Sequence, residues 1–553
     1  MNIRIISIPL LLTWLILGTT VFASEAGNWD ELIAQGVQYR LQGNLTQAVD
    51  VLVQASEKAQ GSQKARASGE LGATLILAHR YDEAEAPLLL AYHFFSGPER
   101  SVYALDLGNL SVAKKDIDQA RRYYTEAVNT SAGNSSIEVS AELNLAKIAS
   151  DATHLSQLVA IEPKLAKIPD SLQRARFALN LGNQARKLIP AVGALPLAYR
   201  NLENARLLLQ GSNKLRQQAE TLDSLAQLYE DEHRAKDALS LSQQAIEMVN
   251  QLPQSEAGDL PVNLEWRIGR LSKELGQPHQ ALAAYQRAVS NIESVRRDMP
   301  IEYEDGQSSF RMTLEPIYTG LIDLLLQQAH ALPIQERSSL LKRAIETTEL
   351  IKQSEMQDYL GDRCIIDGVR NESTGGVEEG VALLYPIIMQ DRIELLLKTN
   401  AGITLQTMPI NNELVRHTAK VFASRLREGA PNFLTTSQKL YDWLIRPFDE
   451  TLLEAKIRTL VVVPDSVLRL VPMAALNDGE NYLVEKFAVS TVAGISMTNT
   501  QPAANENVLS LVAGMSKPGS VMDKLSGELV AQITNAATLS DSPELAMRGL
   551  ASE

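Results

Sequence analysis

The residues best suited to nucleophilic chemistry in this 553-residue chain are its single cysteine, Cys364, and its seven histidines. A cysteine attacks as the thiolate, so it needs a histidine or another cation that lowers its pKa. Cys364 follows Arg363, but no histidine lies near it in the sequence. The histidines lack the spacing of metal ligands, and one cysteine excludes a disulfide framework or a cysteine-rich zinc site. We therefore predict neither a catalytic thiol nor a metal site.

Neither a serine nucleophile nor a known cofactor motif can be assigned in the sequence either. Gly514-Met515-Ser516 follows an apolar run in the order of a hydrolase nucleophile turn. That arrangement needs a later histidine, and none follows His417. A phosphate-binding glycine loop, a dinucleotide glycine pattern and a His-Glu-x-x-His helix are all missing from the sequence. We therefore expect no cofactor.

The balance of charges argues against one class of partner. Lys and Arg number 52 and Asp and Glu 66, which gives a net charge of −14. A chain of this charge repels phosphate groups, so we do not expect it to bind nucleic acid.

The elements that position any functional residue begin with a repeat array in the first half of the chain. Ala48, Ala84 and Ala120 recur at a constant spacing of 36 residues. Each of these alanines has a glycine before it and a large residue and a second alanine after it. The three sets are Gly36, Leu52 and Ala55; Gly72, Leu88 and Ala91; and Gly108, Tyr124 and Ala127. A later copy consists of Gly269, Ala281, Tyr285 and Ala288. Small residues let two antiparallel helices approach closely while the large residue fills the gap. Gly43 and Gly276 stand where one helix must end and turn, which favours a positive φ.

This pattern resembles the tetratricopeptide repeat family over residues 28–290, and the resemblance implies an α-solenoid. Its concave surface, lined by the first helix of each pair, binds peptides in many members, so we expect a protein or peptide partner there. The family's groove positions fall on Arg40, Asn109, Asn183, Arg186, Trp266, Arg270 and Lys273, with Val37 and Val112 beside them. One repeat instead offers the acidic residues Glu220, Asp223, Glu230 and Asp231. Basic flanks around an acidic centre favour a charged partner segment; the alternative is a solvated helix face.

The N-terminus predicts export. Arg4 is the only charge before an apolar run from Ile5 to Ala23, which ends in the small residues that a signal peptidase reads. We expect residues 1–23 to be a signal peptide removed after Ala23, and the alternative is an uncleaved membrane anchor. No later stretch is apolar and long enough to cross a bilayer. The mature protein is then expected to be periplasmic or extracellular, without a membrane contact after signal removal.

Composition changes after the repeats. Residues 291–378 keep helical periodicity and then become Gly-rich, which predicts a helical bridge and a linker. Three short β-prone runs, 381–388, 392–398 and 403–409, are separated by turn residues and predict an antiparallel meander. Helices are expected over 413–427, capped by Asn411 or Asn412, and over 435–456. Thr459 to Val463 is a continuous apolar run, typical of a strand in a parallel sheet.

The stretch after that run carries a second resemblance. Val461-Val462-Val463-Pro464-Asp465-Ser466-Val467-Leu468-Arg469-Leu470-Val471-Pro472-Met473-Ala474-Ala475-Leu476, followed by Tyr482-Leu483-Val484-Glu485-Lys486-Phe487-Ala488-Val489-Ser490, resembles the opening of a CHAT domain. CHAT domains form a caspase-like cysteine peptidase family that is often fused to tetratricopeptide repeats in exported bacterial proteins. The resemblance implies an α/β caspase-like domain over residues 379–553. Its catalytic residues would be a histidine followed by glycine and a cysteine at the end of the next strand.

Neither catalytic position can be assigned in this chain. The run from Val508 to Val512 is similar to the next strand of the family. Both catalytic residues would lie beyond it, where the sequence has no His-Gly pair and no cysteine. We therefore expect a mainly α protein, with a tetratricopeptide-type α-solenoid followed by an incomplete CHAT domain. The function we predict is that of an exported repeat protein that binds a partner and is inactive alone as a peptidase. The alternative is a CHAT cysteine endopeptidase whose catalytic part lies beyond this chain.

Overall fold

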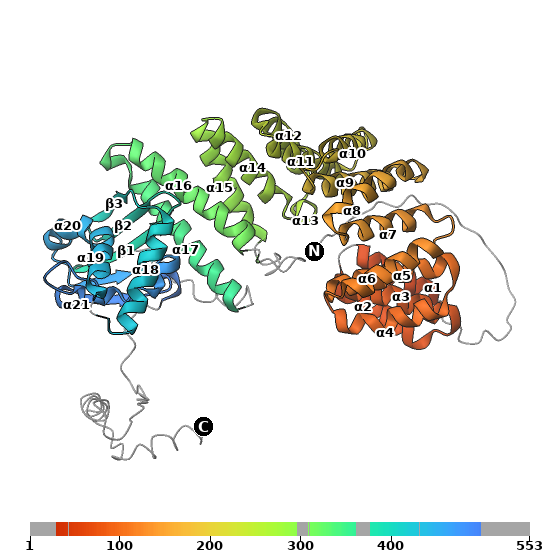
Figure 1. Ribbon diagram of the computed structural model, residues 1–553, viewed down its shortest axis with the longest axis horizontal. Coiled ribbons are helices and arrows are strands. Elements are labelled where there is room, and N and C mark those ends of the chain that lie inside the picture. The colour runs from red at the N-terminus through yellow and green to blue at the C-terminus, as the bar shows by residue number, and fades with distance from the viewer. Residues whose placement is uncertain are drawn as a thin grey trace, which may run out of the picture. The chain divides into compact units, whose positions relative to one another are not determined.

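The computed structural model describes residues 29–41, 44–295, 308, 310–360, 376–430 and 432–498 (Figure 1). The predicted signal peptide, Gly43, Cys364 and the run after Val508 lie outside these residues. Within the described part of the chain, no helix combines the length and the apolar character needed to cross a bilayer.

Residues 29–295 form consecutive helix pairs. Each first helix packs on its own second helix and on the first helix of the next pair. The first helices are α1 (Trp29–Leu41), α3 (Gly61–Leu77), α5 (Gly97–Ala113), α7 (Ser135–Lys147), α9 (Ser171–Lys187), α11 (Leu215–Asp231) and α14 (Leu260–Glu274). The second helices are α2 (Leu45–Lys58), α4 (Tyr81–Phe94), α6 (Ile117–Thr130), α8 (Asp151–Ile161), α10 (Ala194–Leu209), α12 (Ala235–Val249) and α15 (Pro278–Val295); η1 (Glu162–Lys167) and α13 (Gln254–Ala257) lie between pairs. This is the predicted α-solenoid.

The glycines of the repeat pattern are the points where the two helices of a pair touch. A Cβ added to Gly36 would stand 2.5 Å from Cγ of Leu52, and one added to Gly269 would stand 2.6 Å from the ring of Tyr285. Gly108 meets Tyr124 in the same way. Because real Cβ atoms do not approach so closely, these positions accept only glycine without a shift of the neighbouring helix.

The turn inside several of the pairs uses a left-handed residue, as predicted for Gly276, whose φ is +69°. Other pairs place a side chain at the equivalent position: His79, Lys115 and His233 have φ values of 58°, 63° and 58°. In the first of these turns the N–H of Arg80 donates to the carbonyl oxygen of Leu75 at 2.9 Å, which satisfies a carbonyl at the helix end. The turn geometry is therefore kept even where glycine is absent.

The predicted helical bridge continues the stacking of helices. It contains η3 (Phe310–Leu314), α16 (Glu315–Ala331), η4 (Ile334–Glu336) and α17 (Ser338–Leu360), and α16 packs on both α15 and α17. The ring of Tyr285 lies against Gly320 of α16 as well as Gly269 of α14, because neither position carries a Cβ. One aromatic ring thus joins the last repeat to the bridge.

A five-stranded mixed sheet follows, in the order β3-β2-β1-β4-β5. Its strands are β1 (Val381–Ile388), β2 (Ile393–Thr399), β3 (Gly402–Met408), β4 (Thr459–Val462) and β5 (Ala488–Thr491). The first three form the predicted antiparallel meander, with Leu384 opposite Leu397. β4 pairs in parallel with both β1 and β5, as predicted for a buried apolar run.

Helices cover both faces of this sheet. On one face Tyr385 and Leu396 pack with side chains of α16 and α17. On the other face Leu384 and Leu460 pack with Phe422 and neighbouring residues. That second layer contains α18 (Asn412–Arg427), α19 (Phe433–Leu444), η6 (Arg446–Phe448), α20 (Asp449–Glu454), η7 (Ser466–Leu470), η8 (Met473–Ala475) and α21 (Leu483–Lys486), and η9 (Ile495–Met497) ends the described chain. Asn411 caps α18 as predicted, because its side chain accepts the N–H of Leu414.

Candidate functional site

The predicted partner-binding residues all lie on first helices, and most of them contact the neighbouring first helix. We call the surface formed by α1, α3, α5, α7, α9, α11 and α14 the first-helix face. Five of them pair with a residue of the adjacent first helix, whereas Lys273 reaches α16 and Trp266 lies beneath Arg270 of its own helix. Their side chains are half-buried, apart from the exposed Lys273.

In the N-terminal repeats these contacts link α1 to α3 and α5 to α7. Arg40 forms an ion pair with Glu70 at 2.6 Å and donates to the hydroxyl of Thr74 at 3.3 Å. The amide oxygen of Asn109 accepts from Tyr124 at 2.9 Å and from Asn144 at 3.0 Å. Both side chains are therefore held in fixed orientations before any partner arrives.

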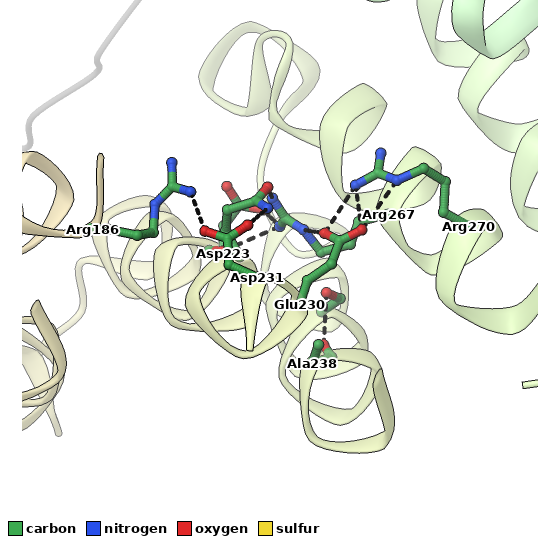
Figure 2. A network of polar contacts seen from close by, with 9 residues as sticks. Arg186, Asp223, Glu230, Asp231, Ala238, Arg267 and Arg270 are labelled. Carbon is green, nitrogen blue, oxygen red and sulfur yellow. Dashed lines mark hydrogen bonds and ion pairs between the residues drawn. The ribbon is translucent and has the colours of Figure 1, made fainter. Parts of the chain in front are cut away.

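The middle of the face is a continuous polar network (Figure 2). Arg186 of α9 reaches Asp231 of α11 at 2.5 Å. Arg267 of α14 pairs with both Asp223 and Glu230 of α11, at 3.1 Å for Glu230. Arg267 is only 7% exposed, so the network has a buried cation at its centre. Arg267 was not predicted from the sequence, because it lies off the groove positions of the repeat pattern.

The predicted cluster at the C-terminal end of the array belongs to the same network. Arg270 pairs with Glu230 at 2.8 Å and lies over the ring of Trp266, with its guanidinium carbon 4.3 Å from the ring centroid. Asn183 donates to Ser224 at 3.1 Å. Two residues of the expected basic flanks, Arg186 and Arg270, thus pair with the acidic centre, whereas Glu220 pairs with Arg216 of its own helix. Partner binding by these residues stays a prediction.

Lys273 carries the contacts into the bridge and the sheet. It reaches Asp323 of α16 at 2.6 Å, and Asp323 also accepts from Arg392 at 2.5 Å. Arg392 in turn pairs with the fully buried Glu394 of β2 at 2.6 Å. Burial by itself raises the pKa of Asp323, but the two cations outweigh burial and hold that pKa below its usual value. The carboxylate is therefore ionised when it joins the array to the sheet.

Asp106, an acidic residue on the first-helix face, has a pKa that is raised and not lowered. Burial and the neighbouring Glu70 raise the pKa of Asp106, on α5, to about 7. Arg40 opposes this shift only in part. The charge of this part of the face therefore changes near neutral pH.

The two histidines nearest the sheet in sequence are His330 and His417. Neither can be paired with a thiol among the described residues, because the single cysteine lies outside them. Nε2 of His330 lies 3.0 Å from the hydroxyl of Thr407 and 3.3 Å from Glu394. His417 is exposed on α18, and Cys364 lies outside the described residues. In the described ranges, His, Asp and Glu side chains form no group that could hold a metal ion.

Comparison with known proteins identifies the C-terminal part. Residues 434–544 match the family model described as CHAT domain. The chain contains a CHAT domain. This match covers α19, the parallel strands β4 and β5, and sequence beyond the described residues, and it confirms the resemblance seen in the sequence.

Solved structures resemble this chain only distantly. A tetratricopeptide repeat protein from Parabacteroides merdae is 14% identical, with a TM-score of 0.32 over 48% of this chain and 96% of that chain. A Rap protein complexed with competence and sporulation factor is 13% identical, with a TM-score of 0.35 over 60% and 86%. The human IFIT1 dimer with PPP-AAAA is 14% identical, with a TM-score of 0.40 over 60% and 72%. No curated protein sequence matches this chain significantly.

Proposed function

We propose that this chain is an exported protein-binding protein in which the first-helix face of the solenoid holds a protein or peptide partner next to a CHAT domain. The observation that supports this most is the row of half-buried hydrogen-bonding side chains that crosses successive first helices from Arg40 to Arg270. Partly exposed groups that neighbours already orient lose little side-chain entropy when a partner binds.

The ion pairs within the first-helix face limit the kind of partner segment that this face can bind. Arg186, Arg270 and Lys273 each have a carboxylate partner within 2.8 Å. A charged segment would have to compete with these internal ion pairs, whereas polar groups of a peptide can use the remaining hydrogen-bonding capacity of Asn109 and Asn183. The proposed partner segment is therefore bound mainly by hydrogen bonds.

Site-specific photo-crosslinking tests this function. A benzophenone amino acid replaces Val112, which is half-buried on α5, and a control protein carries it at Leu207, which is 54% exposed on the second helix α10. We expect the same cellular protein to be cross-linked repeatedly through position 112 and not through position 207. Equal cross-linking from both positions, or none from position 112, would contradict binding on the first-helix face.

A second candidate function, cysteine endopeptidase, is favoured by the CHAT match over residues 434–544. The sequence resemblance requires a histidine followed by glycine and a later cysteine, and residues 434–553 contain neither. Reading the coding DNA beyond the codon for Glu553 tests this candidate. A reading frame that supplies both residues supports the peptidase, and a stop codon with no such residues in any frame downstream contradicts it.

Export has its own test. We propose that residues 1–23 are removed, which follows from the apolar run and the small residues before Ser24. Mass spectrometry of the mature N-terminus from whole cells should find a chain that begins at Ser24. A mature chain that retains the apolar run contradicts removal.

A further inference from the structure

Asp106 differs from the carboxylates that form the ion pairs of the first-helix face. It is half-buried on α5, in the N-terminal repeats. Within the described ranges of the chain, no group forms an ion pair or a hydrogen bond with its carboxylate. Its charge is therefore open to a group that comes from a partner.

The place of Asp106 in the repeat sets the direction in which its side chain points. It stands two residues before the pattern glycine of its helix, as do Glu70 of α3 and Arg267 of α14. Both of those side chains reach the preceding first helix: Glu70 pairs with Arg40 of α1, and Arg267 pairs with carboxylates of α11 (Figure 2). Asp106 therefore faces α3. The charges that act on its carboxylate, those of Glu70 and Arg40, lie on α3 and α1 and agree with this direction.

Helix α3 supplies no cation at the matching place. Arg40, which pairs with Glu70, stands four residues after the pattern glycine of α1. The same place on α3 is Ile76, a half-buried aliphatic side chain. Arg40 itself is held by Glu70 at 2.6 Å and by the hydroxyl of Thr74 at 3.3 Å. The repeat of Asp106 thus keeps the carboxylate and lacks the cation that pairs with it in the repeat before.

The next repeat shows the same place occupied by a cation from elsewhere in the chain. Glu142 of α7 lies 36 residues after Asp106. Lys164 of η1 binds Glu142 at 2.5 Å and also reaches Glu138 at 2.7 Å. The equivalent carboxylates on both sides of Asp106 are therefore each bound by a basic side chain.

The surroundings of Asp106 favour a cation over a neutral donor. Burial and the charge of Glu70 raise its pKa to about 7, and Arg40 opposes this shift only in part. The other titratable groups beside it are the phenols of Tyr103 and Tyr124, which stay neutral because burial raises the pKa of both. A basic side chain offsets the repulsion from Glu70, and a neutral hydrogen-bond donor does not.

We propose that Asp106 and Ile76 form a subsite of the first-helix face, which we call the Asp106 subsite, and that it binds a basic side chain of the partner segment. This inference rests on the proposed function and adds one charged contact to a segment held mainly by hydrogen bonds. The aliphatic stem of the basic side chain packs on Ile76, and its charged end reaches the carboxylate of Asp106. The complex then repeats the pairing of Arg40 with Glu70. Because the carboxylate must be ionised, binding weakens as the pH falls below 7.

Two fluorescein-labelled nine-residue peptides test the subsite on the full chain. One has a central lysine among serine and asparagine residues, and the other has N-acetyl-lysine there, which keeps the aliphatic stem without the charge. At pH 8 we expect fluorescence polarisation to show at least tenfold tighter binding of the lysine peptide. Asp106→Asn should remove this preference, and so should pH 5.5.

The matched control for overall charge is Asp118→Asn, at an exposed position on the second helix α6. This variant should keep the preference for the lysine peptide. Equal binding of the two peptides at pH 8, no binding of the lysine peptide, or a preference that survives Asp106→Asn overturns the inference.

A variant that supplies the cation from within the chain tests the geometry without a partner. Ile76→Arg places an arginine where α1 carries Arg40, and it should weaken binding of the lysine peptide at least tenfold. In urea unfolding at pH 8, Ile76→Arg should lower stability less in the parent chain than in the Asp106→Asn background, and this difference should vanish at pH 5.5. An equal effect in both backgrounds at pH 8 would show that position 76 does not face Asp106 and would overturn the subsite.

The subsite and the proposed function fail in different measurements. If a partner is cross-linked through position 112 and Asp106→Asn leaves its capture unchanged at pH 8, the subsite is wrong and the first-helix face remains the binding surface. If nothing is cross-linked through position 112, the proposed function is wrong, and a peptide preference that depends on Asp106 then supports the subsite alone. Adducts between position 112 and the same chain would overturn the assignment of the subsite to a partner.

Discussion

Replacing the buried cation of the solenoid, Arg267→Met, gives the sharpest test of how the first helices are held together. Arg267 is 7% exposed and pairs with Asp223 and Glu230, while Gln227 accepts a further N–H at 2.7 Å. Methionine keeps most of the volume but leaves carboxylates without their cation. Removal of one partner of a buried pair costs about 3–5 kcal/mol.

The structure places the expected cost at the lower end of that range. Glu230 keeps Arg270 as a partner at 2.8 Å, so only Asp223 loses its cation. Asp223 is also 22% exposed and can regain some hydration. We therefore expect Arg267→Met to lower the free energy of unfolding by about 3 kcal/mol. Adding Asp223→Asn to Arg267→Met should recover part of this loss, because the unpaired charge is gone.

Urea unfolding followed by circular dichroism measures this effect, with hydrogen exchange of α11 and α14 as the local readout, since repeat arrays can open in parts. The matched control is Arg80→Met, which breaks an exposed ion pair with Glu83 whose side chains are 46% and 59% exposed. The control should leave the unfolding midpoint unchanged. If Arg267→Met behaves like Arg80→Met, the network is a surface feature and the reasoning from burial is refuted.

Three further changes have defined outcomes. Gly108→Ala drives a Cβ into Tyr124 and should destabilise the chain by about 1–3 kcal/mol in urea unfolding, whereas Gly376→Ala, with no atom within 4 Å of the added Cβ, should have little effect. Lys115→Gly relieves a left-handed side chain at φ 63° and should stabilise by about 1 kcal/mol, and a loss of stability would contradict the strain. Asp106→Asn should stabilise the chain above pH 7, on the order of 1 kcal/mol, and lose this advantage near pH 4 in thermal melts. The sign follows because the pKa of Asp106 is raised from 3.8 to about 7, so the folded chain binds more protons between these values and stability falls as pH rises. A stability gain of Asp106→Asn that does not change with pH would contradict the raised pKa of Asp106.

The sequence predicted the repeat hairpins well because their contacts are local. Gly36 and Leu52 touch across one pair, and the same spacing of 16 residues returns at Gly108 and Tyr124. A short turn can join such helices in only a few ways, so composition and spacing specify the pair. The strand boundaries were predicted nearly to the residue for the same reason, since turn residues separate short apolar runs.

The partners of the charged residues could not be predicted in this way. Arg267 reaches Asp223, 44 positions away, and Lys352 reaches Asp465, 113 positions away. Both contacts depend on how one helix slides along another or over a sheet, and a shift of one turn would exchange the partner. The sequence showed basic flanks and an acidic centre, and the packing of α11 between α9 and α14 decided that they neutralise each other.

The sequence alone determined the helical repeats, the antiparallel meander, the apolar strand β4 and the absence of a histidine after His417, because each depends on residue order or on neighbours within a few turns. Tertiary structure alone decided that Asp323 connects the repeats to the sheet and that Lys352 is buried beside Asp465. Burial and long-range register set these features. A carboxylate or an ammonium acquires its role from the groups that packing places around it, and residue spacing does not encode those groups.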